Sequence, residues 1–273
     1  MISNFTKYLN SISKLPKVTV ELDIFRKSNR KNVEELSNLI KSDEFLHQNI
    51  LKIINFNLFD FKGKPKNISN FVLLTNFDFV LSISTALAVM QTTKLNLYSY
   101  AATIDDFLYS NTLASILVEK WVGKINKQLR NELLFPAFLQ EISKPLISDA
   151  ISQNKLTEKF LSSIGSMDNL SLVEESFTSY KSSRVSANIL KKFDLSHNII
   201  LPIAFCEDLE NCPQEFLQKA VILNVLKDIC NLREPLSQMA INRSLDTLSK
   251  YNFETELFLS QINRIKSNID KEI

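Results

Sequence analysis

Two polar side chains, Gln140 and Glu141, interrupt an apolar stretch and are the first place in this sequence where chemistry could occur. Between residues 133 and 151 apolar side chains recur every three or four positions, a pattern that predicts a helix buried over most of its circumference. A buried amide or carboxylate must find hydrogen-bonding partners or border a cleft. Two interpretations follow: a polar pair satisfied by Asn111 or Lys144, which we favour, and a small ligand-binding site.

Histidine and cysteine, the residue types that most often hold metals or act as nucleophiles, are few and badly spaced. Both histidines, His47 and His197, stand far along the chain from Glu141. The three cysteines are odd in number and form no CxxC pair. We therefore expect neither a zinc site nor a disulfide framework, and the composition favours a reducing, cytoplasmic environment.

The composition of the whole chain excludes several classes of protein. Only three of the 273 residues are glycine, whereas hairpins and phosphate-binding loops need glycine at defined positions. This scarcity predicts an all-α fold whose turns use Asn, Asp, Ser and Pro. The net charge of +2 gives no clear nucleic-acid signature. No apolar run reaches the length of a membrane span or of a signal-peptide core, so we expect neither membrane insertion nor secretion.

Caps and prolines place the elements that must position the polar pair. Asn32 with Glu35 three residues later predicts a capped helix start. Pro145 predicts that the stretch around Glu141 is two helices, the first ending near Ser143. The spacing of apolar residues then predicts helices over residues 4–12, 18–26, 33–41, 44–54, 68–74, 77–90, 104–122, 157–164, 170–180, 182–193, 196–206, 215–231, 235–251 and 253–270.

The order of these helices and several sequence segments resemble the HDOD domain, an all-helical relative of the HD phosphohydrolases found in bacterial signalling proteins. The resemblance covers roughly residues 15–230. It begins at Leu15 and Pro16 and continues through VEELSNLIKSDEFLHQNILKIINF and ISNFVLLTNFDFVLSISTALAV. FLYSNTLASILVEKW resembles the helix that carries the first motif histidine, PAFLQEISKPLI the helix of the His-Asp pair, and VILNVLKDI the helix of the last aspartate.

At the positions that match the HD motif, this chain has other residue types. Asn111 stands for the first histidine, Gln140 and Glu141 for the His-Asp pair, and Asn224 for the closing aspartate. Amides bind divalent cations weakly unless several anionic groups support them, and Glu141 is a single carboxylate. The resemblance therefore implies a scaffold without HD chemistry, and we predict no catalytic residue, no metal ligand and no cofactor.

We expect a two-lobed helical bundle of the HDOD, degraded HD-like kind. The predicted parts are an N-terminal helical segment (1–14), an HDOD-like domain (15–230, with an N-terminal lobe of about 15–95 and an HD-like lobe of about 96–230) and C-terminal helices (231–273) packed on the HD-like lobe. The predicted function is that of a non-enzymatic cytoplasmic regulator that contacts protein partners of unknown identity. The alternative is a sensor of a small ligand, such as a nucleotide, bound in the remnant cleft by Asn111, Gln140, Glu141, Lys144 and Asn224.

Overall fold

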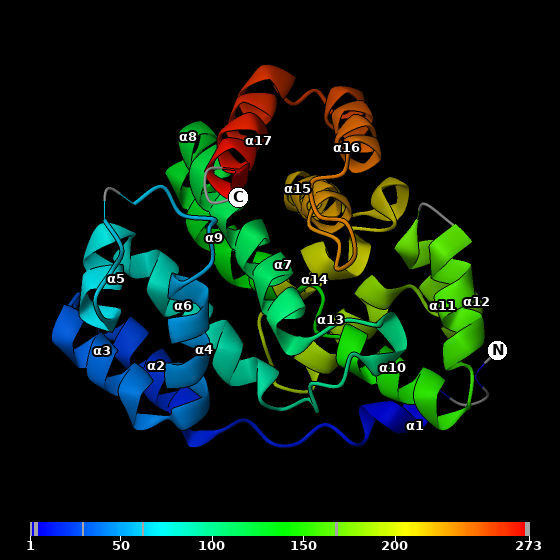
Figure 1. Ribbon diagram of the computed structural model, residues 1–273, viewed down its shortest axis with the longest axis horizontal. Coiled ribbons are helices and arrows are strands. Elements are labelled where there is room, and N and C mark those ends of the chain that lie inside the picture. The colour runs from blue at the N-terminus through cyan, green and yellow to red at the C-terminus, as the bar shows by residue number, and fades with distance from the viewer. Residues whose placement is uncertain (1, 3–4, 29, 62, 167–168, 271–273) are drawn as a thin grey trace. The chain divides into compact units, whose positions relative to one another are not determined.

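All regular secondary structure in the described part of the chain is helical, which confirms the predicted all-α class (Figure 1). The computed structural model describes residues 2, 5–28, 30–61, 63–166 and 169–270. Asn4, the predicted start of the first helix, lies outside these residues. None of the described helices is long and apolar enough to cross a membrane.

The chain forms two compact units, each assembled from segments that are far apart in sequence. Unit 1 contains Met1–Ser13, Thr93–Asn111 and Leu139–Thr255, and unit 2 contains Lys14–Thr92, Thr112–Phe138 and Glu256–Ile273. One division falls inside helix α7 (Ile104–Leu117) and another at the end of α9 (Lys127–Leu139). The lobe boundaries inferred from the sequence stay a prediction.

Unit 2 contains a bundle in which four helices surround one apolar helix. Helix α6 (Phe77–Met90) packs against α2 (Lys17–Lys27), α3 (Val33–Ser42), α4 (Glu44–Ile54) and α5 (Ile68–Leu74) (Figure 1). Side chains of Asn and Asp cap four of these helices by accepting a backbone N–H: Asn32, Asp43, Asn67 and Asn76. Because Asn and Asp are preferred N-cap residues, these four helices have well-defined first turns without glycine.

The remainder of unit 2 packs around Trp121, the single tryptophan of the chain. After α7 the backbone widens into a π-helical turn, η2 (Val118–Val122), and continues through α8 (Gly123–Ile125) into α9. The Trp121 ring is fully buried, and its centroid lies 4.9 Å from that of Phe258 on α17 (Thr255–Ile269). This aromatic contact joins the C-terminal helix to a segment more than a hundred residues earlier.

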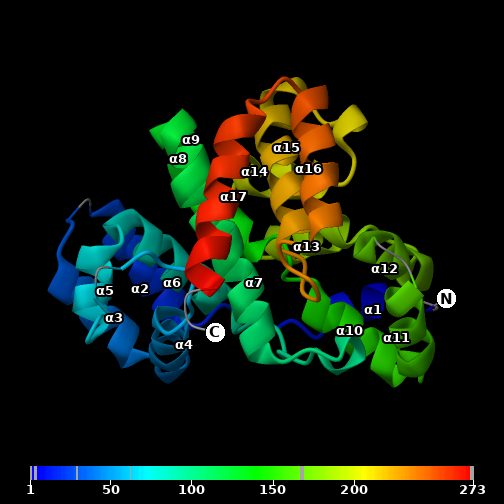
Figure 2. The ribbon, with the colours of Figure 1, turned by 45° about the horizontal axis from the view of Figure 1, so that its top comes forward.

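Unit 1 holds the helices that surround the predicted site. They are α1 (Thr6–Leu9), the 3-10 turn η1 (Tyr98–Tyr100), α10 (Lys144–Gln153), α11 (Thr157–Ser166), α12 (Leu170–Thr178), α13 (Ser182–Lys191), α14 (His197–Phe205), the 3-10 turn η3 (Leu209–Asn211), α15 (Gln214–Ile229) and α16 (Gln238–Lys250). Helix α15 packs between α14 and α16, and Figure 2 shows α15 and α16 side by side. Helix α1 lies against α10, far from it in sequence.

Candidate functional site

The site is built at a break between two helices that Pro145 imposes. Helix α9 ends at Leu139 and α10 begins at Lys144, so Gln140 and Glu141 lie in the connecting turn. A proline ring clashes with the carbonyl four residues earlier, here that of Glu141, and the helix cannot continue through it. The sequence predicted a break near Ser143, and the structure begins it at Gln140. As a result Glu141 lies outside both helices.

A buried hydroxyl satisfies the backbone of this turn. The Ser186 hydroxyl on α13 donates to the Gln140 carbonyl at 2.7 Å and accepts the Ser143 N–H at 3.2 Å. Both serine side chains are completely buried. Because an unpaired backbone group would be costly at this depth, Ser186 stabilises the turn that presents Glu141.

Two buried ammonium groups engage the carboxylate of Glu141. Lys144 Nζ lies 2.8 Å from Glu141 Oε2, and Lys227 Nζ, which reaches in from α15, contacts Glu141 Oε1. The Lys227 ammonium also donates to the Ser182 hydroxyl at 3.0 Å. Glu141, Lys144 and Lys227 are 6%, 3% and 8% exposed. Each carboxylate oxygen therefore already has a cation against it.

A second carboxylate, that of Glu174 on α12, contacts the same group of buried charges. Its Oε1 atom lies 2.7 Å from Lys144 Nζ and accepts the Tyr100 hydroxyl at 2.8 Å. Glu174 is fully buried and Tyr100 nearly so. Glu141, Glu174, Lys144 and Lys227 thus form one buried network, hereafter the ion cluster, in which two negative and two positive charges balance.

The pKa values of three members of the ion cluster, Glu141, Lys144 and Lys227, are shifted so that the charged form of each is favoured. Burial by itself would raise the pKa of Glu141, but Lys144 and Lys227 lower that pKa to about 2. Burial lowers the pKa of both lysines, and the facing carboxylates outweigh it, so each lysine pKa is raised. Burial and Glu174 raise the pKa of Tyr100 well above its usual value. At neutral pH Glu141, Lys144 and Lys227 are therefore charged and Tyr100 is protonated.

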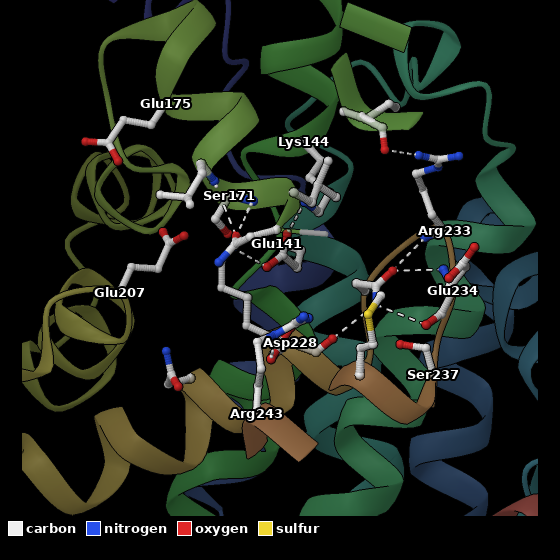
Figure 3. A pocket seen from close by; sticks show the side chains of 18 of the residues that line it. Glu141, Lys144, Ser171, Glu175, Glu207, Asp228, Arg233, Glu234, Ser237 and Arg243 are labelled. Carbon is white, nitrogen blue, oxygen red and sulfur yellow. Dashed lines mark hydrogen bonds and ion pairs between the residues drawn. The ribbon is translucent and has the colours of Figure 1, made fainter. Parts of the chain in front are cut away.

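A cavity of about 450 Å³ in unit 1 borders the ion cluster, since Glu141, Lys144 and Lys227 are among its lining residues. This volume lies within the range of small-molecule sites. Figure 3 shows Glu175 and Glu207 on one side of the view, Arg233, Glu234 and Ser237 on the other, and Glu141, Lys144 and Ser171 between them. Acidic and basic side chains line the cavity in equal number: Glu141, Glu175, Glu207, Asp228 and Glu234 against Lys144, Lys181, Lys227, Arg233 and Arg243.

Several of these charged side chains have structural partners. Arg243 on α16 forms a two-pronged ion pair with Asp228 on α15, with Nε 2.8 Å from Oδ2. Glu207 accepts the Ser183 N–H at 2.7 Å at the start of α13. Although burial raises the pKa of Glu207, Lys227 and serine hydrogen bonds hold it below its usual value. The cavity wall therefore carries charges of both signs in equal number, and several of them are held in ion pairs or hydrogen bonds.

Three of the five residues predicted for the remnant cleft line this cavity: Glu141, Lys144 and Asn224. Asn224 donates its side-chain N–H to the Cys206 carbonyl at 2.7 Å. Asn111 and Gln140 are each 2% exposed and are not among the lining residues. The Asn111 amide nitrogen and the Gln140 side-chain oxygen have no hydrogen-bond partner among the described residues. The structure thus brings part of the predicted set together and leaves the other part in the interior.

Three residues of this site, Lys227, Glu174 and Tyr100, were not predicted from the sequence. A pattern for Lys227 was present, because Asn224, Lys227 and Asp228 follow the spacing of one helical face in the mostly apolar second half of α15, and all three line the cavity. No comparable pattern marks Glu174. Its role depends on the packing of α12 against α10, which spacing along the chain does not reveal.

The arrangement does not suit the divalent metal that an HD-type site holds. Such an ion needs several free anionic or imidazole ligands, and Glu141 is already neutralised by two ammonium groups. Bringing a divalent cation beside Lys144 and Lys227 would add strong like-charge repulsion in a poorly solvated place. Within the described residues no group of three or more His, Cys, Asp or Glu side chains is arranged to hold a metal.

Comparisons with known proteins agree with this geometry at the level of the fold. The model of the HDOD domain family matches residues 12–209. Solved structures with the same fold include a virulence factor from Campylobacter jejuni, at 18% identity and a TM-score of 0.60, covering 98% of this chain and 100% of that one. An HDOD domain protein with unknown function from Geobacter sulfurreducens follows at 14% identity and 0.59, covering 98% and 97%. A "Putative phosphohydrolase" from Shewanella amazonensis SB2B has 14% identity and 0.62, covering 97% and 94%. No curated protein matches the sequence.

Proposed function

The chain belongs to the HDOD domain family, and from this premise we propose that it is a non-enzymatic cytoplasmic regulator that works through contacts with other proteins. The ion cluster is the observation that carries the proposal. A hydrolase of the HD type needs a metal-bound water, and this chain has lysine ammonium groups against the one motif carboxylate. The fold is retained while the groups that would activate water are replaced.

Exposed apolar side chains in unit 2 support the role of protein contacts. Val20 and Ile24 lie one helical turn apart on α2 and are 54% and 63% exposed. Leu73 and Leu74 at the end of α5 are 69% and 52% exposed. Large apolar side chains left in water in this way are typical of surfaces that bind partners.

An assay of hydrolysis tests the non-enzymatic part of the proposal. The purified chain is incubated with Mn²⁺, Mg²⁺ or Fe²⁺ and with cyclic dinucleotides, nucleotides or generic phosphodiesters. We expect no turnover above a heat-denatured control. Turnover that Glu141→Ala abolishes, and that a surface variant such as Glu210→Ala retains, would contradict the proposal.

Partner capture tests the second part. The chain and its Ile24→Lys variant are used as paired baits in native extract, with Lys17→Glu on the same helix as a control for charge change. We expect Ile24→Lys alone to lose a specific partner. If all three baits capture the same proteins in equal amounts, the α2 surface is not the contact.

A second candidate function is supported by the cavity, which suits a small ligand. Of the residues proposed for ligand binding, Glu141, Lys144 and Asn224 are placed to contact such a ligand. Because acidic and basic side chains line the cavity in equal number, a nucleotide must use Lys181, Arg233 or Arg243 for its phosphates while its other groups face carboxylates. A thermal-shift panel of nucleotides tests this function, and a shift lost in Arg233→Ala would support it. The absence of any shift would count against it.

A further inference from the structure

Lys227 is a buried cation that connects three separate elements of unit 1. It extends from α15 to Glu141 in the turn before α10 and to Ser182 at the start of α13. These contacts span 86 and 45 residues of sequence. A metal ion in a protein does the same work, because it joins anionic groups from distant segments at one point.

From this geometry we propose that the Lys227 ammonium is a covalently attached substitute for a bound cation, on which the folding of unit 1 depends. Lys144 contacts Glu141 from only three residues away and Glu174 on α12 from 30 residues away, so it connects only α10 with α12, whereas the contacts of Lys227 reach farther along the chain. Lys227 provides both the charge and the connection. The inference concerns stability and stands independently of whether the chain is an enzyme.

The charges around Lys227 explain why removal of its ammonium group would destabilise the fold of unit 1. Without this ammonium, Glu141 and Glu174 would share the single cation of Lys144, and the buried cluster would carry a net negative charge. Removing one partner of a buried pair is far more costly than removing a surface pair, because the remaining charge stays desolvated. By the same reasoning, another cation delivered to the vacated place should restore much of the stability.

The cavity offers a route by which such a cation can arrive. Lys227 is among its lining residues, so removal of the side chain would enlarge the cavity toward Glu141. A lysine-to-alanine change deletes three carbons and the ammonium nitrogen, which together correspond to propylammonium. This ion is therefore the matched probe, and n-propanol is its uncharged counterpart.

The experiment measures thermal unfolding of the full chain and of Lys227→Ala, with and without each probe. The control is Lys250→Ala, which removes an ammonium from an exposed ion pair with Glu210 at 3.2 Å. We expect Lys227→Ala to lower Tm by roughly 10 °C and Lys250→Ala to change it little. Propylammonium should raise the Tm of Lys227→Ala along a binding curve, rising with the logarithm of concentration, and leave the wild type and Lys250→Ala unchanged.

Two results would overturn the proposal. One is a Tm of Lys227→Ala close to that of Lys250→Ala, and the other is equal recovery with propylammonium and with n-propanol. If Lys227→Ala fails to fold, the thermal stabilities of Lys227→Arg and Lys227→Met are compared instead. Both variants keep a long side chain, and only Lys227→Arg keeps the positive charge. Retained stability in Lys227→Arg and lost stability in Lys227→Met support the substitute cation, and equal stability of the two refutes it. Activity with a metal would refute the proposed function and leave these results as they are.

Discussion

Replacing Glu141 by glutamine is the most informative perturbation of the ion cluster, because it keeps the shape of the side chain and removes its charge. In the native chain Glu141 lies against Lys144 and Lys227. In Glu141→Gln these two ammonium groups would lose the one carboxylate that contacts both of them, leaving Glu174 against Lys144 and Glu207 interacting electrostatically with Lys227. The variant should therefore fold less stably at neutral pH.

The pKa of Glu141 gives the size of this effect. The folded structure lowers that pKa from 4.5 to about 2. Since one pKa unit corresponds to about 1.4 kcal/mol, the ionised carboxylate contributes about 3 kcal/mol to the free energy of unfolding at pH 7. Removing one member of a buried ion pair typically costs a similar amount, about 3 to 5 kcal/mol. For a chain of this size the corresponding fall in Tm is roughly 6 to 12 °C.

The sign of the pH dependence follows from the lowered pKa. The folded state binds the proton of Glu141 more weakly than the unfolded state does, so the stabilisation is complete above about pH 4.5. It is lost as the pH falls from there toward 2. The difference in Tm between the wild type and Glu141→Gln should accordingly be largest near neutral pH and shrink in acid.

Circular dichroism at 222 nm, followed against temperature at several pH values, measures this difference. Glu210→Gln serves as the control, because Glu210 is a surface carboxylate whose side chain is 82% exposed. A Tm difference for Glu141→Gln that is as small as that for Glu210→Gln, or that does not change with pH, would refute the assignment of a buried ionised carboxylate.

Three further outcomes are expected. Tyr100→Phe should lower the free energy of unfolding by about 1 to 3 kcal/mol, because the Tyr100 hydroxyl donates to the charged Glu174, and chemical denaturation would measure it. Phe258→Ala should cost about 3 to 5 kcal/mol and shift the emission of Trp121 to longer wavelength, since it removes the ring packed on the single tryptophan; unchanged emission would contradict the contact. Burial raises the pKa of the Cys206 and Cys230 thiols, so a thiol reagent near neutral pH should modify the partly exposed Cys212 first and all three cysteines only after denaturation; rapid modification of all three in the folded chain would refute this.

The fold was largely predictable because its information is local. The nearly continuous apolar run from Phe77 to Met90 predicted α6 with the bounds that the structure has, and Asn32 accepts the N–H of Glu35 as a capping residue should. The family resemblance is confirmed by the match over residues 12–209. The ends of helices were harder to predict. The helix predicted over residues 104–122 ends at Leu117 and continues as a π-helical turn, for which the sequence contains no recognisable pattern.

The candidate site was only partly predictable because its key contacts are not local. The polar pair pointed to Glu141, and the spacing of three pointed to Lys144. The contact of Glu141 with Lys227 depends on how α15 packs in unit 1, and that of Lys144 with Glu174 on the position of α12. Asn111 and Gln140, which stand at matching motif positions, are buried and are not among the residues that line the cavity.

Metal binding tests the central claim most directly. The purified chain is titrated with Mn²⁺, Mg²⁺ and Fe²⁺ while its Tm and its metal content are measured, alongside Glu141→Ala. The ion cluster predicts no stoichiometric metal and no rise in Tm that depends on Glu141, because Lys144 and Lys227 already neutralise this carboxylate. A stoichiometric divalent ion that raises the Tm of the wild type and is lost in Glu141→Ala would contradict it.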